Sequence, residues 1–169
     1  MNLSFDVITK EGDKLVVSLT SFYPYMDELI GNMFSGMELV EISIYRESGN
    51  NPIRMEVFGK IAQVLITIAQ DNPQTLFYYF CDATERLPHQ RAGRNIALHE
   101  YRNTLFSKLF KRYQQQAGVH WSDIEIELKS DIEEQVFYAH LLIRDKHLSL
   151  VDILRNEILS NFKTISEQK

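Results

Sequence analysis

The residues of this sequence best suited to chemistry are an acid at the end of an apolar stretch and the arginines that follow it. The stretch is Thr75–Cys81, and the polar group behind it consists of Asp82, Arg86, His89, Arg91 and Arg94. Guanidinium groups form paired hydrogen bonds with phosphates and carboxylates, and free N–H groups at a helix start favour the same anions. In open sheets, ligands bind beyond the carboxyl ends of strands. The sequence therefore predicts a binding site here for a small anionic ligand or a protein partner.

The distribution of charge supports this site and also leaves a structural alternative. Between Arg86 and Arg112 there are seven basic residues and one acid, a net charge of +6, whereas the whole chain carries −5. Such asymmetry can mark an anion-binding face. It also fits a helix whose charged residues cover its solvent side, with Asp82 paired to a neighbouring arginine. The negative total argues against non-specific nucleic-acid binding.

Other kinds of chemistry find less support in the sequence. Cys81 could act as a nucleophile if His89 or His99 were its base, but a cysteine that ends a buried strand is more often inert. The five histidines lack metal-ligand spacing, and no glycine-rich phosphate loop or Gly-x-Ser-x-Gly motif is present. We therefore expect no metal and no cofactor, and the sequence indicates no catalytic residue.

Basic and aromatic residues alternate in the segment that follows the arginine-rich stretch. The aromatic residues are Tyr101, Phe106, Phe110 and Tyr113, and the basic ones are Arg102, Lys108, Lys111 and Arg112. Such mixing can bind single-stranded nucleic acid. At helical spacing the aromatic side chains more often form core while the bases extend outward, and we favour this second interpretation.

The elements that would position these residues follow from hydrophobic periodicity. Alternation at residues 3–7 and 15–19 around Gly12-Asp13 predicts a β-hairpin, and Leu39–Tyr45 predicts a third strand. A helix is expected to about Gln70, with Asn51 as its cap and Pro52 in its first turn. The unbroken apolar run 75–81 predicts a central strand that is buried on both faces.

The second half continues the alternation of helices and strands. We expect a helix at about 94–117, paired strands near 124–128 and 136–143, and a last helix from about Ser149. The order is βββαβαββα. This order predicts one α/β (α+β) domain over residues 1–169, with a mixed, largely antiparallel sheet of about six strands and three main helices.

Composition sets the compartment and the class of protein. The single cysteine, Cys81, cannot form an internal disulfide and indicates a reducing compartment. No secretory signal is recognisable at the start of the sequence, and no stretch reaches the roughly 18 apolar residues of a membrane span. We therefore expect a cytoplasmic protein that does not associate with membranes. The sequence is also compatible with a homodimer.

Several segments together resemble a family of small single-domain bacterial proteins of unknown function. They are the helix Val57–Ala69, Asp71-Asn72-Pro73, the strand end Phe80-Cys81-Asp82, the run Arg86/Arg91/Arg94, Phe106 with Phe110, and Tyr138-Ala139. The resemblance covers about four fifths of the chain. It implies no activity, because none is assigned to that family.

The element order alone is similar to the core of the Gcn5-related acyltransferases. In that fold the turn before the first core helix has an Arg-x-x-Gly-x-Gly/Ala pattern for the coenzyme A pyrophosphate. Here the corresponding residues, Asn51–Glu56, lack the glycines. Our leading hypothesis is thus a non-catalytic binding module with its site near residues 82–94. The alternative is an acyltransferase-like enzyme with a degenerate coenzyme A loop.

Overall fold

The computed structural model describes residues 1–21, 36–51, 53–81, 98–118, 120–129 and 136–167. The elements in chain order are β1 (Asn2–Ile8), β2 (Lys14–Ser21), β3 (Glu38–Ser48), α2 (Met55–Asp71), β4 (Thr75–Cys81), α3 (Leu98–Ala117), β5 (Trp121–Lys129), β6 (Val136–Arg144), the 3-10 helix η2 (Asp145–Leu150) and α4 (Val151–Glu167). The predicted order βββαβαββα is therefore confirmed.

The strands form one mixed, six-stranded sheet in the order β1-β2-β3-β4-β6-β5. Only the β3–β4 pair is parallel among the described strands, and the other four pairs are antiparallel. The parallel pair requires a crossover, which α2 supplies. The predicted α+β class with a largely antiparallel sheet is confirmed.

The central strand β4 is buried on both faces, as its continuous apolar sequence predicts. Leu76 and Phe77 point to opposite faces, and both are buried. Phe77 joins a core cluster with residues of α2 and α3, whereas Leu76 joins a second cluster with residues of α4. Burying one such side chain contributes about 1.5–3 kcal/mol. A strand of this kind needs helices on both sides of the sheet.

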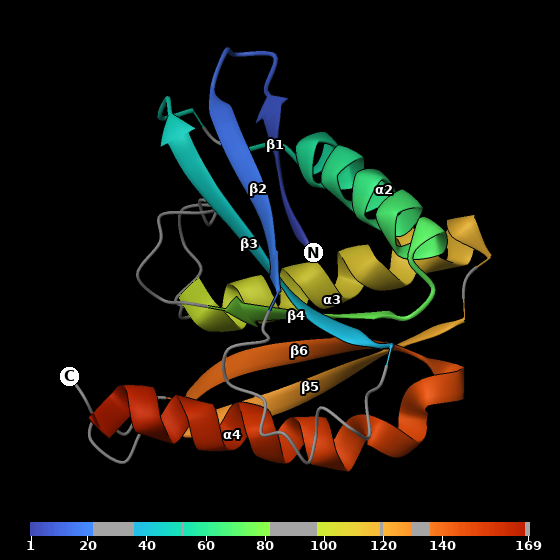
Figure 1. The fold of residues 1–169 in the computed structure, drawn as a ribbon. Coiled ribbons are helices and arrows are strands. Elements are labelled where there is room, and N and C mark those ends of the chain that lie inside the picture. The colour runs from blue at the N-terminus through green and yellow to red at the C-terminus, as the bar shows by residue number, and fades with distance from the viewer. Residues whose placement is uncertain (22–35, 52, 82–97, 119, 130–135, 168–169) are drawn as a thin grey trace.

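The helices meet this need, because α2 and α3 cover one face and α4 covers the other (Figure 1). Val57, Phe58 and Ile61 are the buried apolar residues in the first half of α2. On α4, Leu154 and Ile158 are buried against the opposite face. The helices at about 52–70 and from about Ser149 therefore cover the sheet. On α2, Val64 has the helical spacing of the apolar residues Val57, Ile61, Leu65 and Ile68, which predicts an inward position, but it is 40% exposed.

The parallel strands β3 and β4 pair over only five residues each and then separate. Their register begins at Glu38 and Thr75 and ends at Ile42 and Tyr79. Beyond this point β3 continues beside β2, while β4 continues beside β6. The sheet therefore opens into two halves, β1-β2-β3 and β4-β6-β5, which diverge in Figure 1. We call this opening the β3–β4 split.

The start of α2 is fixed by Asp13 at the end of the first hairpin. The buried carboxylate of Asp13 accepts hydrogen bonds from the Asn51 main-chain N–H and side-chain amide, each at 2.9 Å. It also forms an ion pair with Arg46 at 3.4 Å. Our assignment of Asn51 as the helix cap is wrong, because Asp13 already engages its side chain and the helix begins at Met55 after Arg54.

Close approach explains the glycine next to this cluster. Gly49 has φ +88°, and a Cβ on it would lie 1.9 Å from an Asp13 carboxylate oxygen. Only glycine fits both the left-handed conformation and the space. The loop between β3 and α2 is therefore held on Asp13, and α2 has a defined point of departure.

No helix in the described part of the chain is long and apolar enough to cross a membrane.

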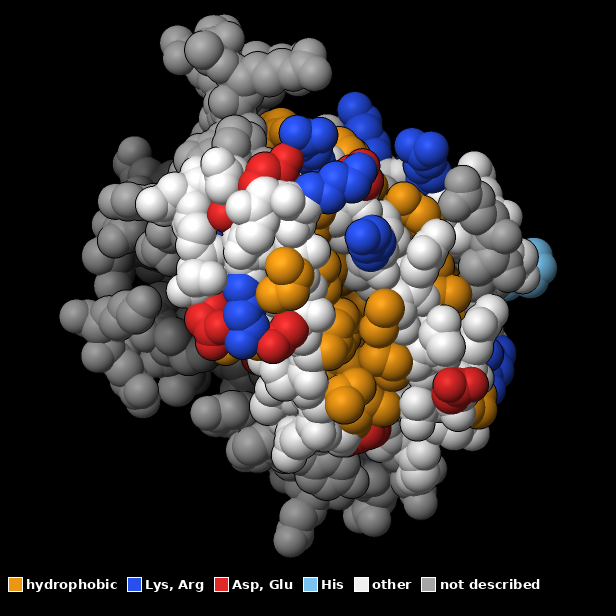
Figure 2. Space-filling model, turned by 90° about the horizontal axis from the view of Figure 1, so that it is seen from above, with side chains coloured by type: hydrophobic (Ala, Val, Ile, Leu, Met, Phe, Trp, Pro, Cys, Tyr) orange, Lys and Arg blue, Asp and Glu red, His pale blue; other side chains and the backbone are white. Residues whose placement is uncertain are grey.

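One face of the molecule carries a strip of hydrophobic side chains with lysines and arginines beside it (Figure 2). The large apolar side chains that are most exposed among the described residues are Leu3, Ile8, Tyr45, Met55, Val64 and Leu148. Apolar patches of this kind are where a protein partner would bury surface.

The contrast between Ile61 and Val64 on α2 gives a direct test of the fold. Ile61 is 2% exposed in the core, so Ile61→Ala should lower the free energy of unfolding by about 2–5 kcal/mol. Leu154→Ala should cost a similar amount from the other face. Val64→Ala is the matched control on the same helix, and it should cost less than about 0.5 kcal/mol. Denaturant unfolding measures all three, and equal effects at residues 61 and 64 would contradict this packing.

Candidate functional site

The five residues predicted to bind an anion, Asp82, Arg86, His89, Arg91 and Arg94, lie outside the described residues. The structure does describe the two points between which this segment runs. It leaves β4 at Cys81 and reaches α3 at Leu98. The anion site therefore stays a prediction from sequence.

Cys81 is a poor candidate for a nucleophile. Its side chain is fully buried among the residues between the sheet and α3. Burial raises the pKa of the thiol to about 12, although the nearby Arg102 opposes this effect. Cys81 is therefore a neutral thiol at physiological pH, which favours our interpretation of it as core packing.

A hollow in the described structure lies between α2, α3 and the sheet. Its volume is about 270 Å³. Aromatic residues provide much of the wall: Phe58, Phe77, Tyr79, Phe80, Phe106, Phe110, Tyr113 and Trp121. The polar side chains are Glu41, Ser43, Arg102 and Gln114. We call this hollow the α2–α3 cavity.

The wall of the α2–α3 cavity includes residues from both faces of the sheet at the β3–β4 split. Ile42 and Tyr79 form the last parallel pair and belong to the face that α2 and α3 cover. Glu41 and Phe80 point to the opposite face, the one that α4 covers, and they also line the cavity. Ala62 and Phe110 are half-buried wall residues on α2 and α3. The cavity is therefore not sealed inside the core, and a small molecule can approach it.

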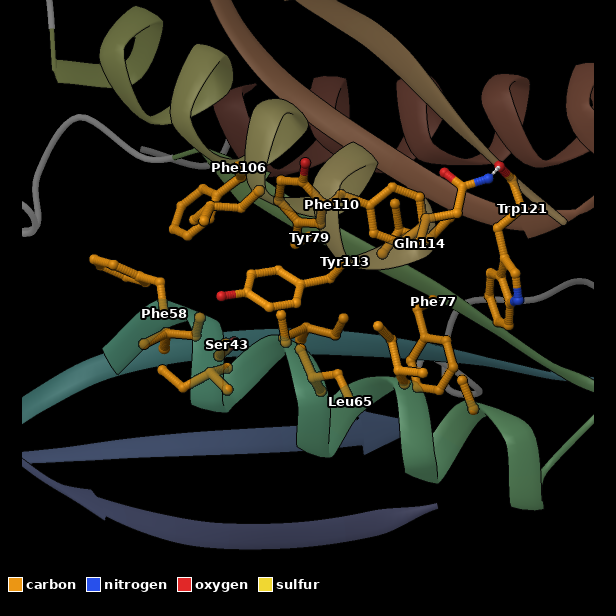
Figure 3. A pocket seen from close by; sticks show the side chains of 18 of the residues that line it. Ser43, Phe58, Leu65, Phe77, Tyr79, Phe106, Phe110, Tyr113, Gln114 and Trp121 are labelled. Carbon is orange, nitrogen blue, oxygen red and sulfur yellow. Dashed lines mark hydrogen bonds between the residues drawn. The ribbon is translucent and has the colours of Figure 1, made fainter. Parts of the chain in front are cut away.

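Three contacts close the far end of the cavity around Trp121. The Gln114 side-chain amide donates a hydrogen bond to the Trp121 carbonyl oxygen. Arg144 places its guanidinium 5.1 Å from the centre of the indole ring and donates to the Ala69 carbonyl oxygen at 2.6 Å. The Phe77 ring lies 6.0 Å from the same indole. Through Arg144 these contacts link Trp121 to the last turn of α2. Figure 3 shows the hydrogen bond between Gln114 and Trp121, with Phe77 on the same side of the cavity.

Glu41 is the acidic group of the cavity wall, and its position is unusual for a carboxylate. It lies within the apolar strand sequence Leu39-Val40-Glu41-Ile42 and is half-buried. Desolvation raises the pKa of Glu41 above its ordinary value of 4.5, while the Ser43 hydroxyl, which donates to it at 3.4 Å, opposes the shift. A carboxyl group with a raised pKa beside a cavity is suited to exchanging protons with a bound molecule.

A second buried polar group, centred on His140, lies beneath α3. The ring Nδ1 lies 2.7 Å from Asp123 Oδ1, and Nε2 lies 2.6 Å from Asn103 Oδ1. The Ser107 hydroxyl donates to the second Asp123 oxygen at 2.7 Å. The imidazole is fully buried and stacks on Tyr79 with ring centres 4.6 Å apart.

This arrangement orients a histidine with a carboxylate, as some hydrolases do. Both ring nitrogens of His140 are already engaged, however, and the ring is not among the cavity-lining residues. The group therefore acts as a satisfied polar cluster that ties α3 to β5 and β6 and supports the wall residue Tyr79.

The aromatic residues of α3 belong to the core, as we favoured from their spacing. Tyr101, Phe106, Phe110 and Tyr113 all pack against the cluster that includes the sheet and α2. The prediction for the basic residues fails at Arg102, which is 5% exposed rather than extended into solvent. Within the described residues no group of histidine, cysteine, aspartate and glutamate is arranged to hold a metal ion.

Comparisons of the chain with protein-family models, with curated proteins and with solved structures found no match. They therefore add nothing to either resemblance drawn from the sequence, and the interpretation of the site rests on its geometry.

The α2–α3 cavity and the role of Glu41 were not predicted from the sequence, although both leave a trace in it. Gly59, Ala62 and Ala69 place small residues at helical spacing on α2, where the first and last are buried. Small side chains on an inward face leave room for a neighbour or a ligand. Glu41 interrupts an apolar strand, and a charged residue at such a position is the usual sign of a local function.

The raised pKa of Glu41 predicts a pH dependence of stability. The folded state holds the Glu41 proton more tightly than the unfolded chain, so this residue's contribution is complete below pH 4.5 and is lost as pH rises through the folded pKa. Glu41→Gln should therefore flatten the fall in stability across this acidic range. Urea unfolding at a series of pH values measures the effect, with the exposed Glu127→Gln as control. Parallel profiles for the wild type and Glu41→Gln would contradict the burial of Glu41.

Proposed function

We propose that this chain is a non-catalytic binding protein for a slender amphipathic anion. The apolar part of the ligand occupies the α2–α3 cavity, and the anionic group is bound by the arginine-rich segment that follows Cys81. The observation that carries the proposal is the open, aromatic-lined cavity between α2, α3 and the sheet, beside the β3–β4 split.

The size of the cavity favours occupation by a ligand. Ligand pockets usually measure about 300–1,000 Å³, so about 270 Å³ suits a slender molecule. Because the cavity is open to solvent, a ligand that enters it would move its apolar surface from water onto an apolar wall, which is favourable by about 25 cal/mol per Å² of apolar surface.

The chemistry of the wall favours a mainly apolar ligand with few polar contacts. Aromatic and aliphatic side chains dominate the lining, and only four polar side chains are spread along it. Ligand sites commonly combine such apolar walls with a small number of placed polar groups. An acyl chain or a flat hydrocarbon fits this description better than a sugar or a nucleotide.

The anionic group of the ligand is inferred from sequence position and charge. Asp82 follows the wall residue Phe80 by two positions, and the same segment leads into α3, which carries the wall residue Arg102. The net charge of +6 between residues 86 and 112 would attract an anion to an otherwise acidic protein.

The single cysteine favours a cytoplasmic location for the protein. The same arginine-rich segment could bind a protein partner in place of the small ligand.

Calorimetric titration with dodecanoate and with dodecanol separates the two halves of the proposal. The wild type should bind both, and dodecanoate more tightly. Arg91→Met with Arg94→Met should weaken dodecanoate binding about tenfold or more, since a hydrogen bond to a charged group contributes about 1.5–3 kcal/mol, and should leave dodecanol binding unchanged. Ala62→Phe fills the cavity and should weaken both ligands.

Two outcomes would contradict the proposal. Dodecanoate binding that the two arginine replacements leave unchanged, together with a lowered melting temperature, would mean that these arginines are structural ion pairs. Equal binding by the wild type and Ala62→Phe would place the apolar part of the ligand elsewhere.

The second candidate is an acyltransferase-like enzyme, and the sheet is the observation that favours it. The strand order places one parallel pair at the centre, and this pair separates beyond Ile42 beside a half-buried acid, Glu41. In such an enzyme Glu41 would take the proton of an attacking amine. The residues around the start of α2 do not fit the coenzyme, however. The segment Asn51–Glu56 lacks the glycines of the coenzyme A motif, and Glu56 in the first turn of α2 would repel a pyrophosphate.

Thermal unfolding with and without acetyl-coenzyme A tests this second candidate. A true ligand at 100 times its dissociation constant would stabilise the protein by about 2.7 kcal/mol. Our leading proposal predicts no shift, because the first turn of α2 disfavours the pyrophosphate. A shift, together with amine acetylation that Glu41→Gln abolishes, would make the enzyme the better account.

A further inference from the structure

The α2–α3 cavity is elongated. Its walls extend from Phe58 to Ala69 on α2 and from Arg102 to Gln114 on α3. At a rise of 1.5 Å per residue, each wall is about 17 Å long. The cavity is therefore an elongated channel between the two helices. A channel of this shape can select a chain by its length as well as by its apolar character.

One side chain lies across this channel. In Figure 3 the ring of Tyr113 lies in the middle of the cavity, between α3, which carries it, and the facing side of α2. Phe58, Phe106 and Ser43 lie toward one end of the view, and Phe77, Gln114 and Trp121 lie toward the other. Tyr113 therefore lies between the part of the cavity beside the β3–β4 split and the part that ends at Trp121. We call these two parts compartments.

Gly59 on α2 makes this position of Tyr113 sterically allowed. A Cβ added to Gly59 would lie 2.1 Å from the Tyr113 hydroxyl oxygen and 3.0 Å from the ring carbon that bears it. No larger residue fits opposite the ring unless the ring moves. The ring thus reaches fully across to the main chain of α2, and a ligand chain cannot pass between them without displacing it.

We propose that Tyr113 limits the length of the apolar chain that the cavity accepts, by closing the compartment next to Trp121. This inference rests on the proposed function, since it concerns the ligand of the same cavity. In the wild type the chain occupies the compartment beside the β3–β4 split and ends at the Tyr113 ring. Removal of the ring joins the two compartments, and Trp121, fixed by Gln114 and Arg144, becomes the new end of the channel.

The test is a titration with saturated fatty acids of increasing length, from octanoate to octadecanoate, by calorimetry. The wild type should bind best at one intermediate length and lose affinity beyond it. Tyr113→Ala should move the optimum to longer chains and bind the longest of them at least about tenfold more tightly than the wild type does, since burial of about two further CH₂ groups is enough for a tenfold gain. Tyr113→Phe keeps the ring and should keep the wild-type optimum.

Tyr101→Ala is the matched control. Tyr101 lies on the same helix and packs against the same core cluster, but it does not line the cavity. If Tyr101→Ala shifts the optimum as much as Tyr113→Ala does, general loosening of α3 explains the change and the inference is overturned. If a melting curve shows that Tyr113→Ala does not fold, Tyr113→Leu takes its place with the same expected direction.

The two proposals fail in different ways. A wild-type protein that binds fatty acids with an optimum that Tyr113→Ala and Tyr113→Leu leave unchanged overturns the role of Tyr113 and leaves the proposed function standing. A wild-type protein that binds no fatty acid of any length contradicts the proposed function itself, and the role of Tyr113 with it.

Discussion

The burial of β4 on both faces is the constraint on which the rest of the structure depends. Six consecutive apolar or aromatic residues, Leu76–Cys81, alternate between the two sides of the sheet, and each side must be covered. The chain meets this demand with α2 and α3 on one face and α4 on the other. The strands β3 and β4 are parallel, and a parallel pair needs a long connection between its strands. Helix α2 is this connection, and it carries the chain back across the face that α2 and α3 cover.

The α2–α3 cavity exists because both ends of α2 are held while its middle carries small side chains. At the start, Asp13 binds Asn51 and so fixes the loop that enters the helix. At the end, Arg144 binds the Ala69 carbonyl oxygen. Between these fixed ends, the small side chain of Ala62 lines the cavity, while Gly59 makes room for the ring of Tyr113. At the β3–β4 split, residues from both faces of the sheet join the wall.

Much of the fold could be predicted because its signals are local. The hairpins, the central strand and the three helices each follow from a repeat of two or 3.6 residues in the apolar pattern. The start of α2 could not be placed, since Asn51 is a good cap by type and only the distant Asp13 shows that its side chain is engaged elsewhere. Val64 fits the apolar stripe by spacing, but no described element covers it.

The candidate site was harder to predict for the same physical reason. A cavity is a property of surfaces that meet from distant parts of the sequence, and here they come from β3, β4, α2 and α3. The buried cluster of His140 with Asp123 and Asn103 likewise joins residues from three elements. Periodicity identified the aromatic residues of α3 as core, but it could not show that the core around them is incompletely filled.

Fluorescence of Trp121 tests the central claim, entry of an apolar ligand into the α2–α3 cavity, most directly. Trp121 is the single tryptophan of the chain, it lines the cavity, and it is 6% exposed. Fatty acids that carry bromine along the chain should quench its emission in a saturable way, most strongly in Tyr113→Ala, while aqueous iodide should quench it weakly. Quenching by the brominated chains that is no stronger than quenching by iodide, and that does not saturate, would contradict the account.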